Sequence, residues 1–308
     1  MHNLIWSDGK ICEKEKVSIP IDSLGFLLGI SVFDTVRVYK QAGSEKVHCF
    51  RLMDHINRLY KSLRIARINL EWNAQDIANA IQELILANRI KTDSYIRMTA
   101  YCASPSPGSS LFNPNAVKYG LLITIAESKI QETLKEIRCS ISSWPRVSDS
   151  TMPPRIKAAA NYQNARLAAY EAILDGYDNC IFLNDRGKVS EAAESALIMF
   201  MNNAIVTPDV NSDILESITR DTMLKIAKEL LALEVKEKNV DRTEIYLADE
   251  IFLVNTAKLV RPVTEVDHYV IGSGNIGTIT KSLFEAYMKV ARRETIISEA
   301  WYSNTISV

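Results

Sequence analysis

The sequence is short of the residues from which disulfide frameworks and metal sites are built. Its 308 residues include only five cysteines, which are scattered singly, and four histidines that form no cluster. An odd, dispersed set of cysteines is typical of reduced core thiols in the cytoplasm and not of a disulfide framework. We therefore expect neither a structural metal nor a disulfide scaffold.

Excess charge of one sign and long apolar runs are also lacking. The formal net charge is -1 at pH 7, so no basic surface for a nucleic acid is expected. No apolar run approaches the length of a membrane span, and residues 1–8 lack the basic-then-apolar pattern of a signal peptide. A composition of 47% hydrophobic and 24% charged residues is typical of a soluble globular protein. We expect a cytoplasmic protein without nucleic-acid or membrane partners.

The first part of the chain has the pattern of a small α+β domain, which we expect over residues 1–127. Asp8-Gly9 indicates a hairpin turn, with the return strand expected at 16–20. Residues 32–39 alternate apolar and polar side chains, which predicts a half-buried strand. The further elements expected here are a partner strand at 46–50, amphipathic helices over 52–68 and from Asn73 as N-cap to Asn88, and strands at 95–101 and 119–126.

The second part predicts a larger domain with a strand-rich core and flanking helices. The polar run 128–136 has no apolar stripe, and we expect it to connect the domains. The larger domain is then expected over 137–308. Its expected elements are strands at 137–144, 179–183, within 188–206 and within 240–270, and helices from Asn161, over 219–233 with Thr219 as its cap, and over 280–292.

One lysine lies in a sequence context that favours chemistry. Pro153-Pro154 fixes an extended approach to Lys157, and the alanines at 158–160 add no bulk around it. An amphipathic helix follows, with Leu167, Ala168, Ile173 and Leu174 at helical spacing. Desolvation lowers the pKa of an ammonium group, and the neutral amine can attack a carbonyl to form a Schiff base. The same pattern also fits a surface lysine at a loop-to-helix junction.

A glycine motif near the end of the sequence matches a nucleotide-binding fingerprint, but we do not expect a nucleotide site there. Gly272-Ser273-Gly274-Asn275-Ile276-Gly277 matches the dinucleotide fingerprint between a strand-like run and a helix. Only a helix and a short tail follow it in this sequence, so no second strand with an acidic ribose contact completes the unit. We interpret the motif as a glycine turn.

Three other residues each allow two interpretations. Thr219 begins an amphipathic helix whose N-terminus suits a phosphate, although an ordinary capped helix without a ligand has the same sequence pattern. Arg58 fits either a solvated helix face or a second phosphate ligand. Glu191 follows Val189-Ser190 and precedes two alanines, where a carboxylate could approach a ring, but it also fits a surface position.

Five motifs follow one another along the chain: Arg51 to Leu59, Pro154 to Tyr162, Val189-Ser190-Glu191, Ile214 to Asp221 and Asn255-Thr256-Ala257. In order and spacing they resemble the class IV aminotransferases, and the likeness runs from Trp6 to about Trp301. These are the fold-type IV pyridoxal phosphate enzymes, which include branched-chain aminotransferases, D-amino acid aminotransferases and aminodeoxychorismate lyases. Similarity to the branched-chain branch adds Tyr95-Ile96-Arg97, Phe112-Asn113-Pro114, Ser142-Ser143-Trp144 and Ile279-Thr280-Lys281.

The resemblance implies a role for each matching residue toward pyridoxal 5'-phosphate and substrate. Lys157 is implied as the Schiff-base lysine and proton shuttle, and Glu191 as the partner of the pyridine nitrogen. Tyr162 is implied at the ring hydroxyl. The implied phosphate ligands are Arg58, the backbone of Ile218 and Thr219, and Thr256; the implied substrate contacts are Phe33, Arg37, Tyr95, Arg97, Thr256 and Ala257.

Some positions depart from the family pattern, and they concern the substrate walls more than the cofactor residues. Leu28 stands where branched-chain enzymes usually carry an aromatic ring, and Ile125-Ala126-Glu127 lacks a tryptophan often found there. Glu194 lies in a run that replaces a glycine-rich one. Glu216-Ser217 replaces the usual Pro-Gly before the phosphate helix.

The resemblance implies a transaminase that moves an amino group from a branched-chain or other apolar amino acid to a 2-oxo acid such as 2-oxoglutarate, by a ping-pong mechanism. The alternatives on this scaffold are an aminodeoxychorismate lyase, a D-amino acid aminotransferase and a non-catalytic binding protein. Family likeness also implies a homodimer in which loop 104–115 closes the partner's site. The apolar tip of that loop, Leu111-Phe112, is then expected to reach the other subunit.

Overall fold

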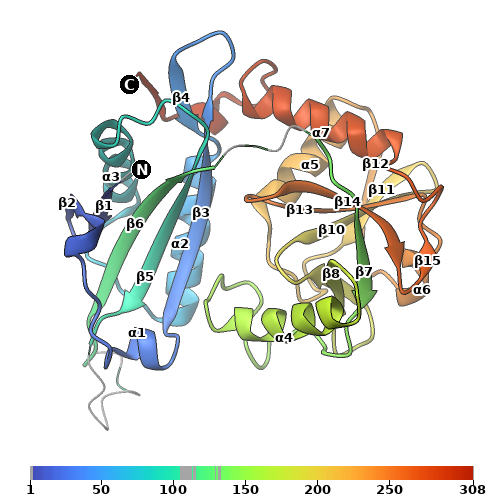
Figure 1. Ribbon diagram of the computed structural model, residues 1–308, viewed down its shortest axis with the longest axis horizontal. Helices are drawn as coiled ribbons and strands as arrows, with labels where there is room; N and C mark the ends of the chain where they lie inside the picture. Colours follow the sequence, from blue (N-terminus) through green and yellow to red (C-terminus); the bar gives the residue numbers. More distant parts are fainter. Residues whose placement is uncertain (1–2, 105–112, 114–115, 129, 131–132, 308) are drawn as a thin grey trace. The chain divides into compact units, whose positions relative to one another are not determined.

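The computed structural model describes residues 3–104, 113, 116–128, 130 and 133–307. The chain divides into two compact units (Figure 1): unit 1 contains residues 1–130, 156–160 and 291–308, and unit 2 contains residues 131–155 and 161–290. This division differs from the expected domains 1–127 and 137–308 in two segments. Residues 156–160, which include Lys157, and the C-terminal residues 291–308 both belong to unit 1.

Unit 1 is built on one antiparallel sheet in the order β16-β4-β3-β5-β6-β1-β2. The hairpin at Asp8-Gly9 is confirmed, but its second strand begins directly after the turn and not at residue 16. The elements of unit 1 are β1 (Leu4–Ser7), β2 (Lys10–Glu13), η1 (Lys14–Lys16), α1 (Leu24–Leu27), β3 (Ser31–Lys40), β4 (Lys46–Cys49), α2 (Leu52–Ala66), α3 (Ala74–Ala87), β5 (Ser94–Cys102), β6 (Tyr119–Glu127), η3 (Glu299–Tyr302) and β16 (Thr305–Ser307).

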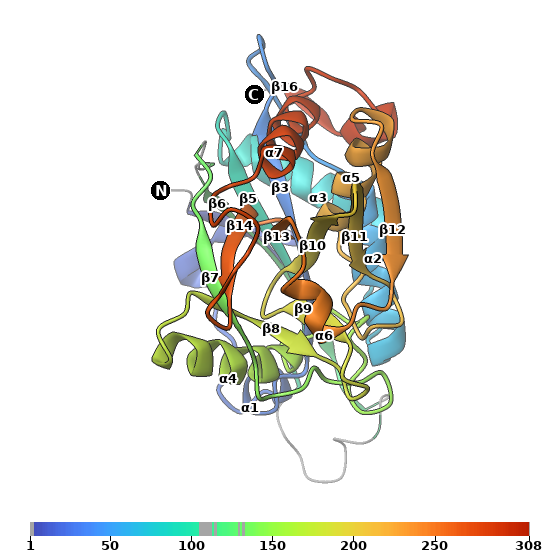
Figure 2. The ribbon, with the colours of Figure 1, turned by 90° about the vertical axis from the view of Figure 1, so that its right-hand side faces the viewer.

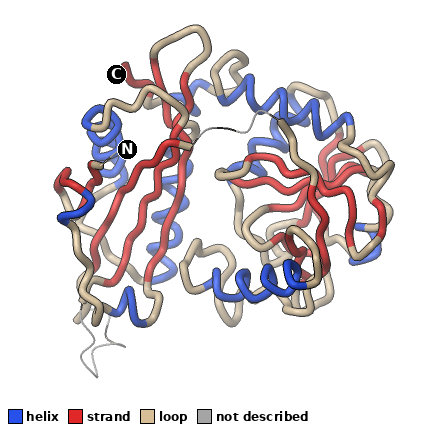
Figure 3. The backbone as a smooth tube through the Cα atoms, in the orientation of Figure 1, coloured by secondary structure: helices blue, strands red, loops and turns tan. Residues whose placement is uncertain are grey.

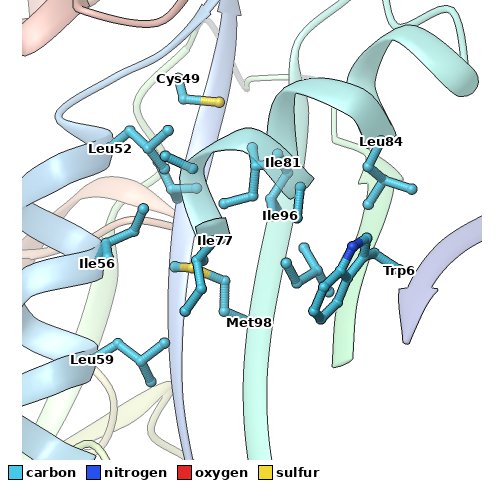
Figure 4. Close-up of a cluster of buried hydrophobic side chains, with 14 of the residues drawn as sticks. Trp6, Cys49, Leu52, Ile56, Leu59, Ile77, Ile81, Leu84, Ile96 and Met98 are labelled. Carbon is cyan, nitrogen blue, oxygen red and sulfur yellow. The ribbon is translucent and has the colours of Figure 1, made fainter. Parts of the chain in front are cut away.

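Helices α2 and α3 cover one face of this sheet, as their periodicity predicts. Asn73 caps α3 in a capping box with Asp76, so the helix begins where the sequence indicates. The apolar stripes of both helices are buried against the sheet (Figure 4). The buried residues labelled there are Trp6, Cys49, Leu52, Ile56, Leu59, Ile77, Ile81, Leu84, Ile96 and Met98.

Strand β3 is buried on both faces, and the expected half-buried strand is therefore wrong. Asp34 and Arg37 do point to opposite faces, as the period of two requires, but both side chains are buried. Asp34 faces α2, where Arg58 and His55 contact it. Arg37 contacts Ser128, just after the end of β6. Polar residues of β3 thus lie inside the fold because they have charged or hydrogen-bonding partners.

The C-terminal segment completes unit 1 through backbone pairing and aromatic packing. β16 adds to the sheet edge beside β4, with Ile306 opposite Val47. The Trp301 ring packs edge-on against Phe50 at 5.7 Å, and the Arg51 guanidinium lies 4.6 Å from its centre. From their place in the sequence, residues 291–308 were expected in the larger domain. These contacts explain why they belong to unit 1 instead.

Unit 2 contains a mixed sheet in the order β12-β11-β10-β13-β14-β7-β8-β9, with β15 paired to β14. The pairs β11–β12, β14–β7 and β7–β8 are parallel, and the other pairs are antiparallel. Figures 2 and 3 show the strands of this sheet together with the helices of the unit. The elements of unit 2 are β7 (Ile137–Ile141), α4 (Asn161–Leu174), β8 (Asn179–Leu183), β9 (Val189–Ala192), β10 (Ala196–Met201), β11 (Ala204–Pro208), α5 (Ile218–Glu229), β12 (Glu234–Lys238), α6 (Arg242–Ile245), β13 (Glu250–Asn255), β14 (Leu259–Val266), β15 (Tyr269–Val270) and α7 (Thr278–Ala291).

Helix α4 buries a different face from the one its large apolar residues suggest. Its buried residues are Asn161, Ala165, Ala168 and Ala172, and the alanines pack against β8. Ile173 and Leu174 are 58% and 86% exposed. Small side chains let the helix approach the strand closely, so they decide the orientation, and the bulky residues remain on the surface.

The glycine motif at 272–277 forms a turn against Glu250, the first residue of β13. The Glu250 carboxylate accepts hydrogen bonds from the backbone N–H groups of Ile279 and Thr280 in the first turn of α7. A Cβ on Gly277 would lie 1.8 Å from the carboxyl carbon of Glu250. The N-terminus of α7 therefore already binds the acidic side chain of Glu250. Gly277 leaves room for that side chain because it has no Cβ.

Two properties of the structure concern membranes and metals. Within the part of the chain that the structure describes, no helix is long and apolar enough to cross a membrane. Over the same residues, no group of three or more His, Cys, Asp or Glu side chains is placed to hold a metal ion. The five cysteines are free thiols, and four of them, at 49, 102, 139 and 180, are buried.

Candidate active site

The backbone of Lys157 is fixed at the edge of β3. The short strand β4 pairs only with residues 38–40 of β3, which leaves the edge at 31–33 open to another segment. Residues 157–159 occupy it: the Phe33 N–H donates to the Lys157 carbonyl at 2.9 Å, and Ala158 bridges Val32. The Lys157 N–H donates to Ser62 Oγ on α2 at 3.2 Å. The backbone N–H and C=O of Lys157 are therefore both hydrogen-bonded, and its side chain takes no part in these bonds.

The Lys157 side chain is half-buried and lies beside an aromatic ring. Its Nζ is 5.1 Å from the centre of the Phe33 ring. The Arg97 guanidinium lies 3.6 Å from the same centre, and its Nε donates to Thr99 Oγ1 at 3.2 Å. β3 pairs with β5 so that Phe33, Arg37, Tyr95 and Arg97 share the face opposite the helices. The pairing thus brings four expected substrate residues and the lysine to one sheet face.

Arg58 is part of a buried network on the helix side of the same sheet. Its Nε and Nη2 donate to the two carboxylate oxygens of Asp34 at 2.8 and 2.9 Å. His55 Nδ1 lies 2.8 Å from Asp34 Oδ1. Burial disfavours charge on Asp34, but Arg58 and His55 outweigh it and hold the pKa of this carboxyl well below its usual range. Burial lowers the pKa of His55. The solvated-face interpretation of Arg58 is therefore wrong.

Arg37 makes contacts that its expected substrate role does not explain. Its Nη1 donates to the Ser128 carbonyl at 3.1 Å, and its Nη2 lies 3.4 Å from Ser128 Oγ. Ser128 is the first residue of the expected connection, and its own N–H donates to the Asp93 carbonyl. Arg37 therefore fixes the chain where it leaves β6.

Unit 2 holds Glu191 in a second buried ion pair. Arg146 Nη2 lies 2.7 Å from Glu191 Oε1, and the side chains are 8% and 7% exposed. The Leu215 N–H donates to Glu191 Oε2 at 3.2 Å. Strand β9, which carries Glu191, is buried along its length, so the surface interpretation of this residue is wrong. An ionised carboxylate is thus held inside unit 2, next to the loop that leads to α5.

The cap of α5 lies earlier in the chain than expected. Ser217, and not Thr219, is the N-cap, and its Oγ accepts the N–H of Arg220 at 3.2 Å. Glu216 pairs with Arg155 at 2.8 Å. The unusual Glu216-Ser217 pair thus supplies a cap and an ion pair in place of Pro-Gly. Ile218 and Thr219 form the first turn of the helix, where backbone N–H groups face an anion most favourably.

Thr256 and Ala257 lie in the turn between β13 and β14. Asn255, just before them, donates from Nδ2 to Ser195 Oγ at 2.8 Å, and Lys258, just after them, pairs with Glu194. Glu194, one of the positions that differ from the family pattern, is therefore held at this turn. Since Glu194 and Ser195 follow β9 closely, the turn lies beside the strand that carries Glu191.

Tyr162 is half-buried in the first turn of α4. Asn164, in the same turn, donates to the Pro145 carbonyl at 3.0 Å, next to the arginine that pairs with Glu191. This contact ties the start of α4 to the Glu191 pair. The expected site residues therefore form two groups, one on each unit of the chain.

Three residues of these networks were missed by the sequence reasoning. Asp34 lies in the expected strand 32–39 and His55 in the motif Arg51 to Leu59, but the sequence pattern assigned neither of them a role. Arg146 lies two residues after Ser142-Ser143-Trp144 but was given no role. A charged residue in an apolar strand, as Asp34 is, was the one available signal, because such a residue needs a partner inside the fold. The expected interface residues Leu111 and Phe112 lie outside the described residues.

Comparisons with known proteins agree with one another. Residues 31–266 match the family model described as amino-transferase class IV. The chain is 34% identical over 297 residues to a probable branched-chain-amino-acid aminotransferase of Aquifex aeolicus (strain VF5), covering 96% of this chain and 94% of that protein. It is 32% identical over 303 residues to the branched-chain-amino-acid aminotransferase of Escherichia coli (strain K12), covering 96% of each.

Solved structures give the same result for the fold. The branched-chain amino acid aminotransferase of Thermobaculum terrenum in its PLP-form superposes with a TM-score of 0.92 at 34% identity, covering 98% of this chain and 97% of that one. The branched-chain aminotransferase of the thermophilic archaeon Thermoproteus uzoniensis, solved with norvaline, gives a TM-score of 0.90 at 32% identity, covering 98% of each chain.

Proposed function

The chain belongs to the class IV aminotransferases, and we propose that it is a pyridoxal phosphate-dependent transaminase for branched-chain or other apolar amino acids. It moves the amino group to a 2-oxo acid, such as 2-oxoglutarate, by a ping-pong mechanism. The observation that carries the proposal is the fixed position of Lys157. Its backbone is bonded on both sides, while its amine lies beside the Phe33 ring.

The residues present fit pyridoxal 5'-phosphate. A half-buried primary amine, Lys157, suits the aldehyde, and the buried carboxylate of Glu191 suits a protonated pyridine nitrogen. The phenol of Tyr162 suits the ring hydroxyl. An arginine and a helix N-terminus are the groups that a phosphate dianion prefers. The phosphate ligands proposed are Arg58, the backbone of Ile218 and Thr219, and Thr256.

Each residue has a defined task in amino-group transfer. When bound, the cofactor would supply an electron sink for the electron pair of the Cα–H bond. Lys157 Nζ would take the proton from the substrate Cα and carry it, since a primary amine is a suitable general base. Arg146 and the Leu215 N–H both stabilise negative charge on Glu191.

The substrate groups proposed lie in both units. On unit 1, Tyr95 and Arg97 bind carboxylate groups, and the Phe33 ring, flanked by Arg97, forms an apolar wall. Arg37, through Ser128, holds the connection next to these residues. On unit 2, the backbone at Thr256-Ala257 contributes to the substrate carboxylate.

A panel of L- and D-amino acids with 2-oxoglutarate tests the reaction and its substrate class. We expect glutamate to form with apolar L-amino acids. Turnover with D-amino acids alone would indicate a D-amino acid aminotransferase. Release of pyruvate and an aromatic amine from aminodeoxychorismate would indicate a lyase. Purified protein without a bound chromophore, and without activity after the cofactor is added, would favour a binding protein.

We further propose a cytoplasmic homodimer as the active unit. Free, buried thiols are typical of a reducing compartment. Apolar side chains of α1 and α4 are exposed, among them Phe26 at 70% and Leu174 at 86%. Loop 104–115 is proposed to close the partner's site. Replacing Leu111 and Phe112 with serine should raise the Michaelis constant for apolar amino acids and leave the cofactor absorbance unchanged; a fully active monomer by light scattering would contradict this.

A further inference from the structure

The Asp34 carboxylate accepts hydrogen bonds at both of its oxygens. Its Oδ2 accepts the Arg58 Nε–H. Its Oδ1 accepts from Arg58 Nη2, from His55 Nδ1 and from the N–H of Thr35 at 2.7 Å. The side chain has no exposed surface. An ionised carboxylate has only acceptors, so His55 Nδ1 carries the hydrogen that it shares with Asp34.

Stability alone does not explain this network. Burying an ion pair costs desolvation, and apolar residues of similar volume often stabilise a fold as well or better. The neighbouring buried side chains Ile56, Leu59 and Leu63 of α2 belong to the apolar core of unit 1. Such a network can instead be retained because it fixes the position of one of its members.

The network fixes Arg58 relative to Lys157. Ser62 lies one turn after Arg58 on α2, and its Oγ donates to the Arg58 carbonyl at 3.1 Å. The same Oγ accepts the N–H of Lys157. Ser62 thus links the backbone carbonyl of Arg58 to the backbone N–H of Lys157 across one turn of α2.

The contact with Asp34 uses one defined edge of the guanidinium. Asp34 takes the edge made by Nε and Nη2. The edge made by Nη1 and the second hydrogen of Nη2 lies outside that contact, and it has the fork geometry that suits a phosphate. Arginine loses rotamer entropy when it binds an anion, so prior fixation by Asp34 makes binding tighter.

We propose that Asp34, supported by His55, is a positioning residue that holds Arg58 for the phosphate of the cofactor. The inference rests on the proposed function, in which Arg58 is a phosphate ligand. Asp34 itself touches neither cofactor nor substrate. Its effect is specific to the phosphate, and it does not extend to the ring or the aldehyde.

Two cofactor forms separate this role from a structural one. Full-length protein is stripped of cofactor and titrated with pyridoxal 5'-phosphate and with pyridoxal, which has the same ring and aldehyde but no phosphate. The ratio of the two dissociation constants is the preference for phosphate. A variant that only loosens the fold weakens both forms alike, whereas a misplaced Arg58 lowers the ratio.

Asp34→Asn is expected to lower this ratio by about tenfold or more while pyridoxal affinity stays within about twofold. The matched control is Asp93→Asn, which breaks the pair between Asp93 and Arg292 in the same unit, at 2.7 Å. The control should keep the wild-type ratio. An unchanged ratio in Asp34→Asn would overturn the inference.

Arg58→Ala distinguishes failure of the inference from failure of the proposed site. If Arg58→Ala loses the preference and Asp34→Asn keeps it, only the positioning role is wrong. If Arg58→Ala keeps the preference, Arg58 is not a phosphate ligand, and the proposed site itself fails.

A pair of variants at His55 decides the question if Asp34→Asn does not fold. His55→Asn retains an N–H donor for Asp34, and His55→Leu removes it. The leucine variant should lower the ratio by about threefold or more, and the asparagine variant should restore it. Equal ratios in the leucine variant and the wild type would overturn the inference.

Discussion

Arg146 and Glu191 form a buried ion pair within unit 2, with Nη2 and Oε1 2.7 Å apart. The arginine also stacks 5.6 Å from the centre of the Phe182 ring, and its Nε is buried without a hydrogen-bond partner among the described residues. The arginine thus lacks one of its possible hydrogen bonds in this pair. The carboxylate, in contrast, is bonded at both oxygens, because Oε2 accepts the Leu215 N–H.

Arg146→Met should destabilise the cofactor-free protein by about 3–5 kcal/mol, because it leaves the Glu191 carboxylate buried and unpaired. The double variant Arg146→Met with Glu191→Gln should lose much less, since the glutamine carries no charge. Urea unfolding of both measures the difference. Equal losses in the single and the double variant would show that the charge of Glu191 is not what Arg146 compensates.

Lys157→Ala should abolish transamination without unfolding unit 1. The backbone bonds of residue 157 to Phe33 and Ser62 do not involve its side chain, so the segment keeps its place. Borohydride should attach the cofactor irreversibly to wild-type protein only, as mass spectrometry can measure. Near wild-type turnover in the variant would mean that the reactive lysine lies elsewhere.

His48 should make the protein less stable as the pH falls from 6.5 toward 4. Its ring is buried, Nε2 donates to the Ala291 carbonyl at 2.8 Å, and burial lowers its pKa to about 4. Between these values the unfolded chain binds a proton that the folded chain does not, so stability decreases by about 3 kcal/mol over the window. Burial lowers the pKa of His55 too, which acts in the same direction.

His48→Gln is the test, because the glutamine amide can still donate to the Ala291 carbonyl but does not titrate. Its urea midpoint should fall less steeply than that of the wild type between about pH 7 and about pH 4.5, the range in which His48 titrates in the unfolded chain. Parallel curves for the two proteins would exclude His48 as a source of the pH dependence.

Gly277→Ala should destabilise α7 by about 1–2 kcal/mol, because the new methyl group would displace the Glu250 carboxylate that caps the helix. Glu250→Ala should cost a similar amount by loss of the same cap. The double variant should cost little more than either single variant, since both act on one carboxylate. Additive losses in thermal unfolding would show that the glycine and the cap are independent.

The local elements of this protein follow from its amino-acid sequence alone, because periodicity, caps and turns are properties of neighbouring residues. The stripe of α3 after Asn73 and the hairpin turn at Asp8-Gly9 are where the pattern predicts them. The order and spacing of the motifs also determined the family, through residues such as Lys157 and Glu191. None of this required knowledge of distant contacts.

The way in which the candidate site residues are held depends on contacts between distant segments. Arg58 meets Asp34 from 24 residues away, and no local pattern encodes which strand face an adjacent helix will cover. The position of Lys157 depends on an edge of β3 that the short β4 leaves open. The orientation of α4 depends on how closely its alanines approach β8. Pairing of buried charges and access to strand edges are properties of the assembled fold, since desolvation and backbone bonding act only once distant segments meet.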